Sequence, residues 1–410
     1  MGWGNLPGKR ISNVQDFYHL KRENNPLRED AFTVSCLGKL FPASSSELIR
    51  CRHWLSTLLD DIPLAPLSLS FQPSLQERGC ASDKMKPFEK EGILIVGLTE
   101  SGIIPAFLMY LESRKRDLNT HLIYSSRRPI AGIAFNEIHS HGPNHVLPLA
   151  GAGAVFKEIW IVEDEITSGN TVINLMGQLQ THMPMERVRI FAFADFRTKD
   201  QKAALISATA KRQIRCSVHI PDFFNGHGKM PGTTEHENPG TCKERDFHIF
   251  QERFVRNVSP PLREDADWHG WHLPLSRPAL GVTSGHFFDP AFRTLSPDFS
   301  DGTLLTVGEA VDLAAWLAWS NRKITFQQIS LSPWQVDQQA IFSRMTFADR
   351  YYLYNYDRLD GPVFILSDPV DRRIEIEVIE KLREHGIRVT PLTFVAEKEK
   401  IKRIACIDDQ

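Results

Sequence analysis

Short apolar runs alternate with longer amphipathic runs along two stretches of the chain. In the first stretch the apolar runs are GILIVGL, HLIYSSRR, EIWIVED and VRIFAFADF, and the amphipathic runs include GIIPAFLMYLESRKR and TVINLMGQLQTHM. Short apolar runs that end at turn residues are typical of buried parallel strands, and the runs between them have the length of helices. The pattern predicts an α/β fold, in which a parallel sheet is covered by helices on both faces.

The regions around this stretch divide the chain further. A strand is predicted near Phe32 to Cys36, and a helix after the serine-rich segment near Ser46. Residues from Asn225 to about Gly270 are rich in Gly, Pro and polar side chains, which indicates a linker or long loop. GTLLTVG, EAVDLAAWLAWSNR and KITFQQIS then predict strand, helix and strand, and GPVFILSD, RRIEIEVIEKLREHG and IRVTPLTF repeat that order. We expect one α/β domain over residues 14–220, an irregular linker over 221–272, and a second, smaller α/β domain over 273–405.

Composition excludes several classes of protein. The chain has 410 residues and a formal net charge of −2, so we expect no nucleic-acid partner. Its apolar runs are shorter than the ~20 residues that cross a bilayer, and its first ten residues lack the apolar core of a signal peptide. Six cysteines occur without a CxxC pair, which favours reduced thiols in the cytoplasm over a disulfide framework or a zinc site.

Two acids and a loop of small residues follow the apolar run from Ile159 to Val162. The acids are Glu163 and Asp164, and the loop is Thr167, Ser168, Gly169, Asn170 and Thr171. Ligands of an open parallel sheet bind beyond the carboxyl ends of its strands, where these residues would lie. The N–H groups and hydroxyls of such a loop can hold an oxyanion, helped by the positive end of the following helix. The combination suits a sugar phosphate, with the acids on ribose hydroxyls and the loop on the 5-phosphate.

Two other segments carry candidate chemistry. The loop Thr99, Glu100, Ser101 and Gly102 follows an earlier strand, and its Glu100 would repel an anion unless Mg²⁺ intervenes or the side chain faces away. The histidine-rich loop contains Glu137, His139, His141 and His145, which suit either a metal site or a mobile cover over an active site. Just upstream, Arg127 and Arg128 are candidate anion clamps.

The run of four apolar residues, two acids and a TxGxT-like loop resembles the 5-phosphoribosyl-1-pyrophosphate (PRPP) signature of type I phosphoribosyltransferases. The resemblance implies that Mg²⁺ is the cofactor, PRPP is one substrate and a nitrogenous base or related acceptor is the other. It assigns Glu163 and Asp164 to the ribose and to Mg²⁺, directly or through water, and Thr167 to Thr171 to the 5-phosphate. Pyrophosphate would be held by Thr99 to Gly102 with Arg127 and Arg128, and Glu137, His139 and His141 would act in proton transfer from a mobile hood.

A closer resemblance covers residues 14 to 215. NPLREDAFTVSCLGKLFP, ILIVGLTESG, SSRRPIAGIAFNEIHSHGPNH and IVEDEITSGNT resemble the PRTase_2 family, which occurs fused to a TRSP domain. Such proteins are associated with tellurium-resistance-type stress operons and with synthesis of a nucleoside-like metabolite. The C-terminal region resembles the TRSP domain, with Ser330-Leu331-Ser332-Pro333 in place of Thr-Arg-Ser-Pro. Arg344 and Arg350 are candidates to replace the missing arginine.

Two other functions fit the same residues. One is a PRPP- or nucleotide-sensing regulator without catalysis, and the other is a phosphoribohydrolase that cleaves a nucleotide. We expect a cytoplasmic enzyme without a membrane partner, and a homodimer is one expectation for its assembly. The identity of the acceptor does not follow from the sequence.

Overall fold

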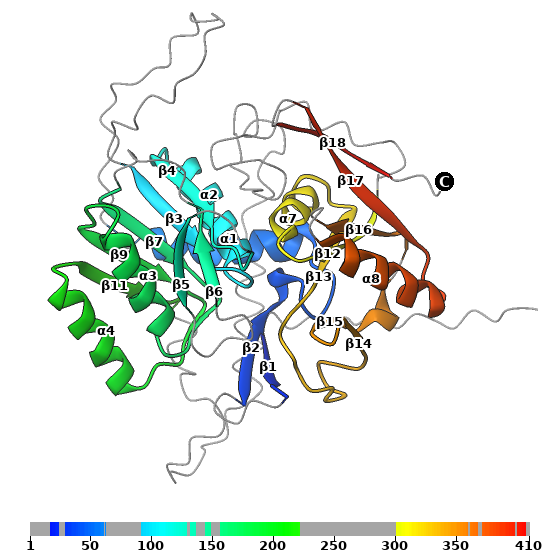
Figure 1. The fold of residues 1–410 in the computed structure, drawn as a ribbon, viewed down its shortest axis with the longest axis horizontal. Helices are drawn as coiled ribbons and strands as arrows, with labels where there is room; N and C mark the ends of the chain where they lie inside the picture. The colour runs from blue at the N-terminus through cyan, green and yellow to red at the C-terminus, as the bar shows by residue number, and fades with distance from the viewer. Residues whose placement is uncertain are drawn as a thin grey trace, which may run out of the picture.

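The computed structural model describes residues 17–23, 29–60, 62, 92–128, 132–136, 144–148, 156–221, 301–359, 361–367, 371–397 and 400–406. They form two α/β lobes, here called the N-terminal lobe (residues 92–221) and the C-terminal lobe (residues 301–406), with an N-terminal segment (residues 17–62) between them (Figure 1). In this described part, no helix is long and apolar enough to span a membrane.

The N-terminal lobe is built on a five-stranded parallel sheet, as the sequence predicted. Its order is β11-β9-β7-β3-β4. The strands are β3 (Ile93–Gly97), β4 (Thr120–Tyr124), β7 (Glu158–Val162), β9 (Arg187–Phe191) and β11 (Arg215–His219). The helices are α2 (Ile103–Lys115), α3 (Asn170–Gln180) and α4 (Lys199–Lys211). The central strands β3 and β7 are mostly apolar because both faces of the sheet are buried there, whereas the edge strand β11 is polar and partly exposed.

Alternate residues of the central strands point to opposite faces of the sheet and belong to different hydrophobic cores. Ile95 of β3 joins the core that contains α2, whereas Leu94 and Val96 join the core that contains α3. Helix α2 is buried from Ile103 to Ser113, because it packs between the sheet and the helices α1 and α7. This explains why its sequence is apolar on every side instead of amphipathic.

Several elements of this lobe were not predicted. Helix α4 begins with a capping box between Thr198 and Gln201, and β11 follows it. Strand β8 (Glu165–Ile166) pairs with β10 (Ala194–Asp195), and β5 (Ile133–Asn136) pairs with β6 (Asn144–Leu147). These strands are too short to give a periodic signal of their own.

The C-terminal lobe has a second five-stranded sheet, in the order β13-β12-β16-β17-β18. Strands β12 (Gly302–Val307), β13 (Ile324–Ile329), β16 (Val363–Ser367) and β17 (Val389–Glu397) are parallel, and β18 (Lys400–Cys406) is antiparallel. Helices α7 (Val311–Ser320) and α8 (Arg372–Glu384) connect them, and β14 (Arg344–Phe347) with β15 (Tyr351–Tyr354) forms a hairpin. The predicted strands and helices are confirmed, whereas β18 and the hairpin were missed.

The N-terminal segment contacts both lobes. It consists of the antiparallel pair β1 (Phe17–Lys21) and β2 (Asp30–Val34), the short helix η1 (Ser35–Leu37), and α1 (Ser45–Asp60). Ala43 and Phe326 exchange two backbone hydrogen bonds, of 2.7 and 3.0 Å. Helix α1 packs on α2 and on α7, and residues of all three helices belong to one hydrophobic cluster. The lobes therefore share a core, although the sequence suggested separate domains.

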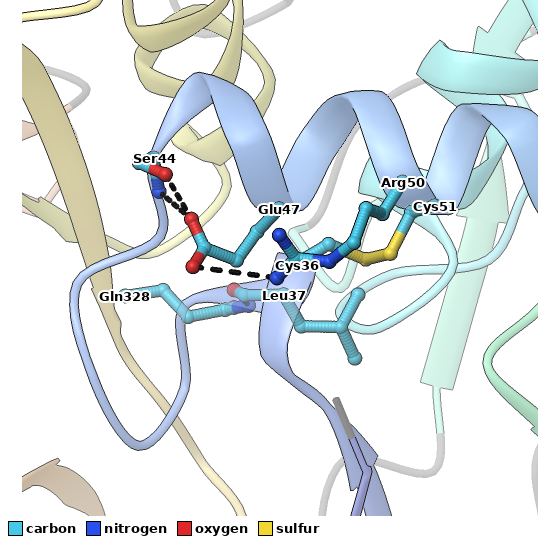
Figure 2. The surroundings of a disulfide bond; sticks show 7 residues. All are labelled: Cys36, Leu37, Ser44, Glu47, Arg50, Cys51 and Gln328. Carbon is cyan, nitrogen blue, oxygen red and sulfur yellow. Dashed lines mark hydrogen bonds and ion pairs between the residues drawn. A yellow bond between two sulfur atoms is a disulfide. The ribbon is translucent and has the colours of Figure 1, made fainter. Parts of the chain in front are cut away.

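A disulfide in this segment corrects the expectation of reduced thiols. Cys36 of η1 is bonded to Cys51 of α1, and both residues are fully buried (Figure 2). They lie 15 residues apart, and they meet because η1 folds back under the helix. Cys216 is a free cysteine of the described part. The absence of a CxxC motif was thus a poor guide, since spacing alone does not show which cysteines meet in space.

Candidate active site

A pocket of about 110 Å³ lies at the carboxyl ends of β3 and β7. The predicted residues that line it are Thr99, Glu100, Ser101, Arg127, Glu163, Asp164, Thr167, Ser168, Gly169 and Thr171. Gly102, Asn170 and Arg128 are not among its lining residues. Glu137, His139 and His141 lie outside the described residues, so their predicted roles stay predictions. The structure therefore brings the two predicted loops and one of the two arginines together.

The acid pair is held by the chain that follows β9. The Glu163 N–H donates to the carbonyl of Phe191 (3.0 Å), and the Asp164 carbonyl accepts from the N–H groups of Phe193 (3.0 Å) and Ala194 (3.3 Å). The Asp164 carboxylate accepts from the N–H of Glu165 (2.9 Å). Because the backbone is fixed in this way, both carboxylates are positioned at the pocket before a ligand arrives.

The loop after the acids turns sharply into α3. Gly169 has a φ of 81° and directly precedes the helix, whose first residue is Asn170. This left-handed conformation favours glycine. The Asn170 N–H donates to Ser168 Oγ at 3.2 Å. The loop thus presents N–H groups and hydroxyls at the positive end of a helix, which is the arrangement that binds phosphate.

A bidentate ion pair supports this loop from behind. Arg197 donates through Nε and Nη2 to the two carboxylate oxygens of Asp195, at 2.8 and 2.9 Å. A Cβ at Gly169 would lie 3.4 Å from Arg197 Cδ. Burial alone would raise the pKa of Asp195, but the hydrogen bonds and charge of Arg197 outweigh burial and hold this pKa below its ordinary value.

The loop after β3 is anchored through a buried histidine. The Thr99 N–H donates to Ser125 Oγ at 2.9 Å, and Ser125 Oγ lies 3.1 Å from His145 Nδ1. His145 is 1% exposed and packs against the ring of Phe135. Among the histidines of the histidine-rich loop, this one supports the loop at Thr99 through Ser125.

Glu100 faces cations instead of empty space. Its carboxylate lies 4.0 Å from Lys39 Nζ and 3.8 Å from Arg127 Nη1, and it accepts from the backbone N–H of Leu331 at 3.1 Å. Two positive charges and an N–H group therefore offset one negative charge. This arrangement removes the electrostatic objection to an acid in a loop that is expected to bind an anion.

The two predicted clamps have different surroundings. Arg127 lines the pocket, and its N–H donates to Glu309 at 2.8 Å. Arg128 instead pairs with Asp371 and lies 3.9 Å from Glu309, both in the C-terminal lobe. Arg128 thus joins the lobes, and its geometry does not favour the predicted role on pyrophosphate.

Ten residues of the pocket lining were not among the predicted site residues: Arg22, Phe32, Lys39, Leu98, Glu165, Ile166, Val172, Leu331, Ser332 and Trp334. Arg22 and Glu165 form an ion pair of 3.0 Å, with side chains only 9% and 4% exposed. A lone cation within the apolar run CLGKLF was a usable signal for Lys39, because a buried charge needs a partner. The C-terminal turn was noted in the sequence for its resemblance to the Thr-Arg-Ser-Pro motif, but its arrival at the pocket depends on the tertiary fold.

The residues present fit Mg²⁺ only together with a substrate. Within the described ranges, groups of three or more His, Cys, Asp or Glu side chains that could enclose a metal do not occur. Mg²⁺ is usually held by one or two carboxylates together with waters and substrate phosphates. Glu163 and Asp164 can supply those carboxylates at the pocket.

Comparison with known proteins identifies the family of the chain. The model of the PRTase_2 family, described as phosphoribosyl transferase, matches residues 18–223, and the chain belongs to this family. The protein is therefore a phosphoribosyltransferase with an α/β fold. No curated protein sequence matches the chain significantly.

Solved structures with a similar fold include adenine phosphoribosyltransferases. The enzyme from Leishmania tarentolae is 11% identical, with a TM-score of 0.32, covering 51% of this chain and 85% of that one. The enzyme from Rhodothermus marinus is 14% identical, with a TM-score of 0.29 and coverage of 50% and 92%. The Trypanosoma brucei enzyme is 8% identical, with a TM-score of 0.27 and coverage of 50% and 77%.

Proposed function

We propose that the protein transfers the phosphoribosyl group of PRPP to a nitrogenous base or related acceptor and releases pyrophosphate. The observation that carries this proposal is that two signature loops, Thr99–Ser101 and Glu163–Thr171, face one pocket at the carboxyl edge of the sheet. In the reaction, the bond from ribose C1 to the pyrophosphate oxygen breaks and a bond from C1 to the acceptor nitrogen forms. The acceptor gives up one proton.

The acid pair and the loop that follows it would bind different parts of PRPP. Glu163 and Asp164 accept hydrogen bonds from the ribose hydroxyls, and their charge stabilises the positive charge that develops on the ribose. The loop from Thr167 to Thr171 holds the 5-phosphate at the start of α3. Glu163 and Asp164 would hold Mg²⁺, directly or through water, and the metal would supply positive charge that neutralises the departing pyrophosphate.

The remaining roles belong to residues near the pyrophosphate. Thr99, Glu100, Ser101 and Gly102, with Arg127, form the loop that binds it, and Arg128 orients the same segment through the C-terminal lobe. We assign the acceptor's proton to Glu137, His139 or His141 on the histidine-rich loop, because imidazole titrates near neutral pH. The same loop would exclude water from the reactive sugar.

The finer context follows from the resemblance of the C-terminal region to the TRSP domain. We propose that the product is a nucleoside-like metabolite of a bacterial stress response and that the protein acts in the cytoplasm. We also propose a division into a phosphoribosyltransferase domain (14–220), a linker (221–272) and a TRSP-like domain (273–405). The contacts of residues 17–62 with both lobes support treating the two domains as one functional unit.

The test is an assay of pyrophosphate release by the purified full-length chain. The protein is incubated with Mg²⁺ and PRPP, with and without a panel of bases. Release that requires one acceptor supports a transferase and identifies its substrate class. Confirmed PRPP binding without release would favour the sensor, and acceptor-independent formation of ribose 5-phosphate would favour a hydrolase.

A matched pair of variants tests the acid pair. Asp164→Asn should lower turnover by about 100-fold or more while PRPP binding changes little, because the charge acts mainly in the transition state. Asp200→Asn is the control, since Asp200 is exposed in the first turn of α4. Equal losses of turnover and PRPP affinity in Asp164→Asn would contradict the assigned role.

A further inference from the structure

We propose that Lys39 and Trp334 form, together with Ser101, an anion-binding wall for the pyrophosphate group of PRPP. Lys39 comes from the N-terminal segment and Trp334 from the turn after β13, so both lie outside the signature loops. The C-terminal lobe is then part of the active site. This inference rests on the proposed function and assigns two further substrate-binding residues to it.

Lys39 is a buried cation directed at the pyrophosphate loop. Its residue is 3% exposed and lines the pocket. Its ammonium group donates to Ser101 Oγ and lies 4.0 Å from the Glu100 carboxylate. Lysine is almost never fully buried unless it is paired, because losing hydration of the charge costs free energy.

Two cations approach one acid at this wall. Lys39 Nζ and Arg127 Nη1 lie 4.0 and 3.8 Å from the Glu100 carboxylate. The acids Glu163 and Asp164 line a different part of the same pocket. The pocket is thus positive beside the loop from Thr99 to Ser101 and negative at the acid pair, which matches a ligand with an anionic group on one side and ribose hydroxyls on the other.

Trp334 adds a hydrogen-bond donor to this wall. The residue is 2% exposed, and its indole Nε1 has no hydrogen-bond partner within the described residues. The ring stacks on Tyr354 at 5.3 Å between centroids, and Lys39 Nζ lies 5.6 Å from the ring centroid. Because these neighbours occupy the ring, its remaining binding capacity is the N–H group. An indole only donates, so it needs an acceptor such as a pyrophosphate oxygen.

The turn that carries Trp334 is held in place on both sides. Ser330 exchanges two backbone hydrogen bonds with Tyr352, of 2.9 and 2.8 Å, and the Trp334 N–H donates to the Tyr354 hydroxyl at 2.7 Å. Leu331 donates its N–H to Glu100. The turn therefore fixes the indole and the pyrophosphate loop relative to each other, as a preorganised anion site requires.

The test compares three ligands on the full-length chain by calorimetry: pyrophosphate, PRPP and ribose 5-phosphate, each with Mg²⁺. Trp334→Phe keeps a six-membered aromatic ring but removes the pyrrole ring with its N–H, and Lys39→Met keeps an unbranched side chain, one heavy atom shorter, and removes its charge. Each variant should bind pyrophosphate and PRPP about tenfold more weakly, as expected for loss of one hydrogen bond to a charged group. Ribose 5-phosphate should bind as it does to the wild-type protein, which also shows that the variant is folded.

Two control variants match these changes elsewhere in the C-terminal lobe. Trp319→Phe alters an indole that has Arg52 5.2 Å from its ring centroid but does not line the pocket. Lys381→Met removes an ammonium group that lies 5.6 Å from the ring centroid of Phe347, the same distance as between Lys39 and Trp334. Both controls should leave all three affinities unchanged.

The outcomes separate this inference from the proposed function. Wild-type affinity for pyrophosphate in both Trp334→Phe and Lys39→Met would overturn the inference and leave the transferase intact. A wild-type protein that binds none of the three ligands would overturn both. If Lys39→Met also loses ribose 5-phosphate binding, its fold is disturbed, and the result of Trp334→Phe decides.

Discussion

Removing the charge of Arg22 should destabilise the protein strongly. Arg22 Nη2 lies 3.0 Å from Glu165 Oε1, and the two side chains are only 9% and 4% exposed. Loss of one partner leaves the other charge buried without its counter-ion, which typically costs about 3–5 kcal/mol. Arg22 also donates to the carbonyl of Asp30, so its loss affects the β1–β2 pair as well. We expect the free energy of unfolding of Arg22→Met to fall by about 3 kcal/mol or more.

The neighbouring residue provides the control. Lys21 also pairs with acids, namely Asp30 and Glu29, but its side chain is 45% exposed. An exposed pair contributes about 0–1 kcal/mol, so Lys21→Met should have a small effect. Urea unfolding followed by tryptophan fluorescence and by circular dichroism gives both values.

A double variant tests the cause of the loss. Arg22→Met combined with Glu165→Leu should recover much of the lost stability, because an apolar pair of similar volume avoids the cost of burying charges. If Arg22→Met costs no more than Lys21→Met, the buried ion pair does not hold the N-terminal segment on the pocket, and the reasoning is refuted.

Three further predictions concern the loops and their supports. Gly102→Ala should lower the free energy of unfolding by about 1–3 kcal/mol and reduce PRPP affinity, because its Cβ would lie 2.5 Å from the backbone oxygen of Val162. The control is Gly177→Ala, whose Cβ would lie 3.3 Å from the flexible end of Arg212. Thermal unfolding and calorimetry give the two quantities for both variants. The folded-state pKa of Asp195 is depressed, so the stabilisation by this carboxylate is present above its unfolded-state pKa and is lost as the pH falls below about 4. The free energy of unfolding of Asp195→Asn, measured against pH, should therefore fall less in acid than that of the wild-type protein. Cys51→Ala should lower the free energy of unfolding by about 3 kcal/mol in urea titrations without reductant, because the disulfide closes a loop of 15 residues. Equal stability of Cys51→Ala and the wild-type protein would contradict a closed disulfide.

The sequence predicted the parts of the fold that local patterns specify. Continuous apolar runs such as Ile93–Gly97 and Glu158–Val162 are buried on both faces. The sequence could therefore predict both that these runs are strands and that they lie inside the sheet. The loops at Thr99 and Glu163 followed because ligands bind at the carboxyl edge of a parallel sheet. Long-range associations could not be predicted, because nothing in the local pattern of Lys39 or Trp334 states which residues they meet.

The disulfide and Arg128 illustrate the same limit. Cys36 and Cys51 meet through the fold of η1 against α1, which the spacing of cysteines does not encode. Arg128 had the residue type expected of an anion clamp, but two carboxylates of the C-terminal lobe occupy its surroundings. Both Arg127 and Arg128 had the residue type and position of an anion ligand. Arg127 lines the pocket, whereas Arg128 pairs with Asp371 and lies near Glu309.

The pairing of Ala43 with Phe326 also has a consequence for biosynthesis. More than 280 residues separate these partners, and Gln328 Nε2 likewise donates to the carbonyl of Leu37, 291 positions earlier. Contacts of such high sequence separation form late, because the intervening chain must first be made and ordered. During translation, the contacts of Leu37 and Ala43 with the C-terminal lobe therefore cannot form until most of the chain has been synthesised. Chaperone demand during synthesis should accordingly be greatest before the strand that contains Phe326 leaves the exit tunnel.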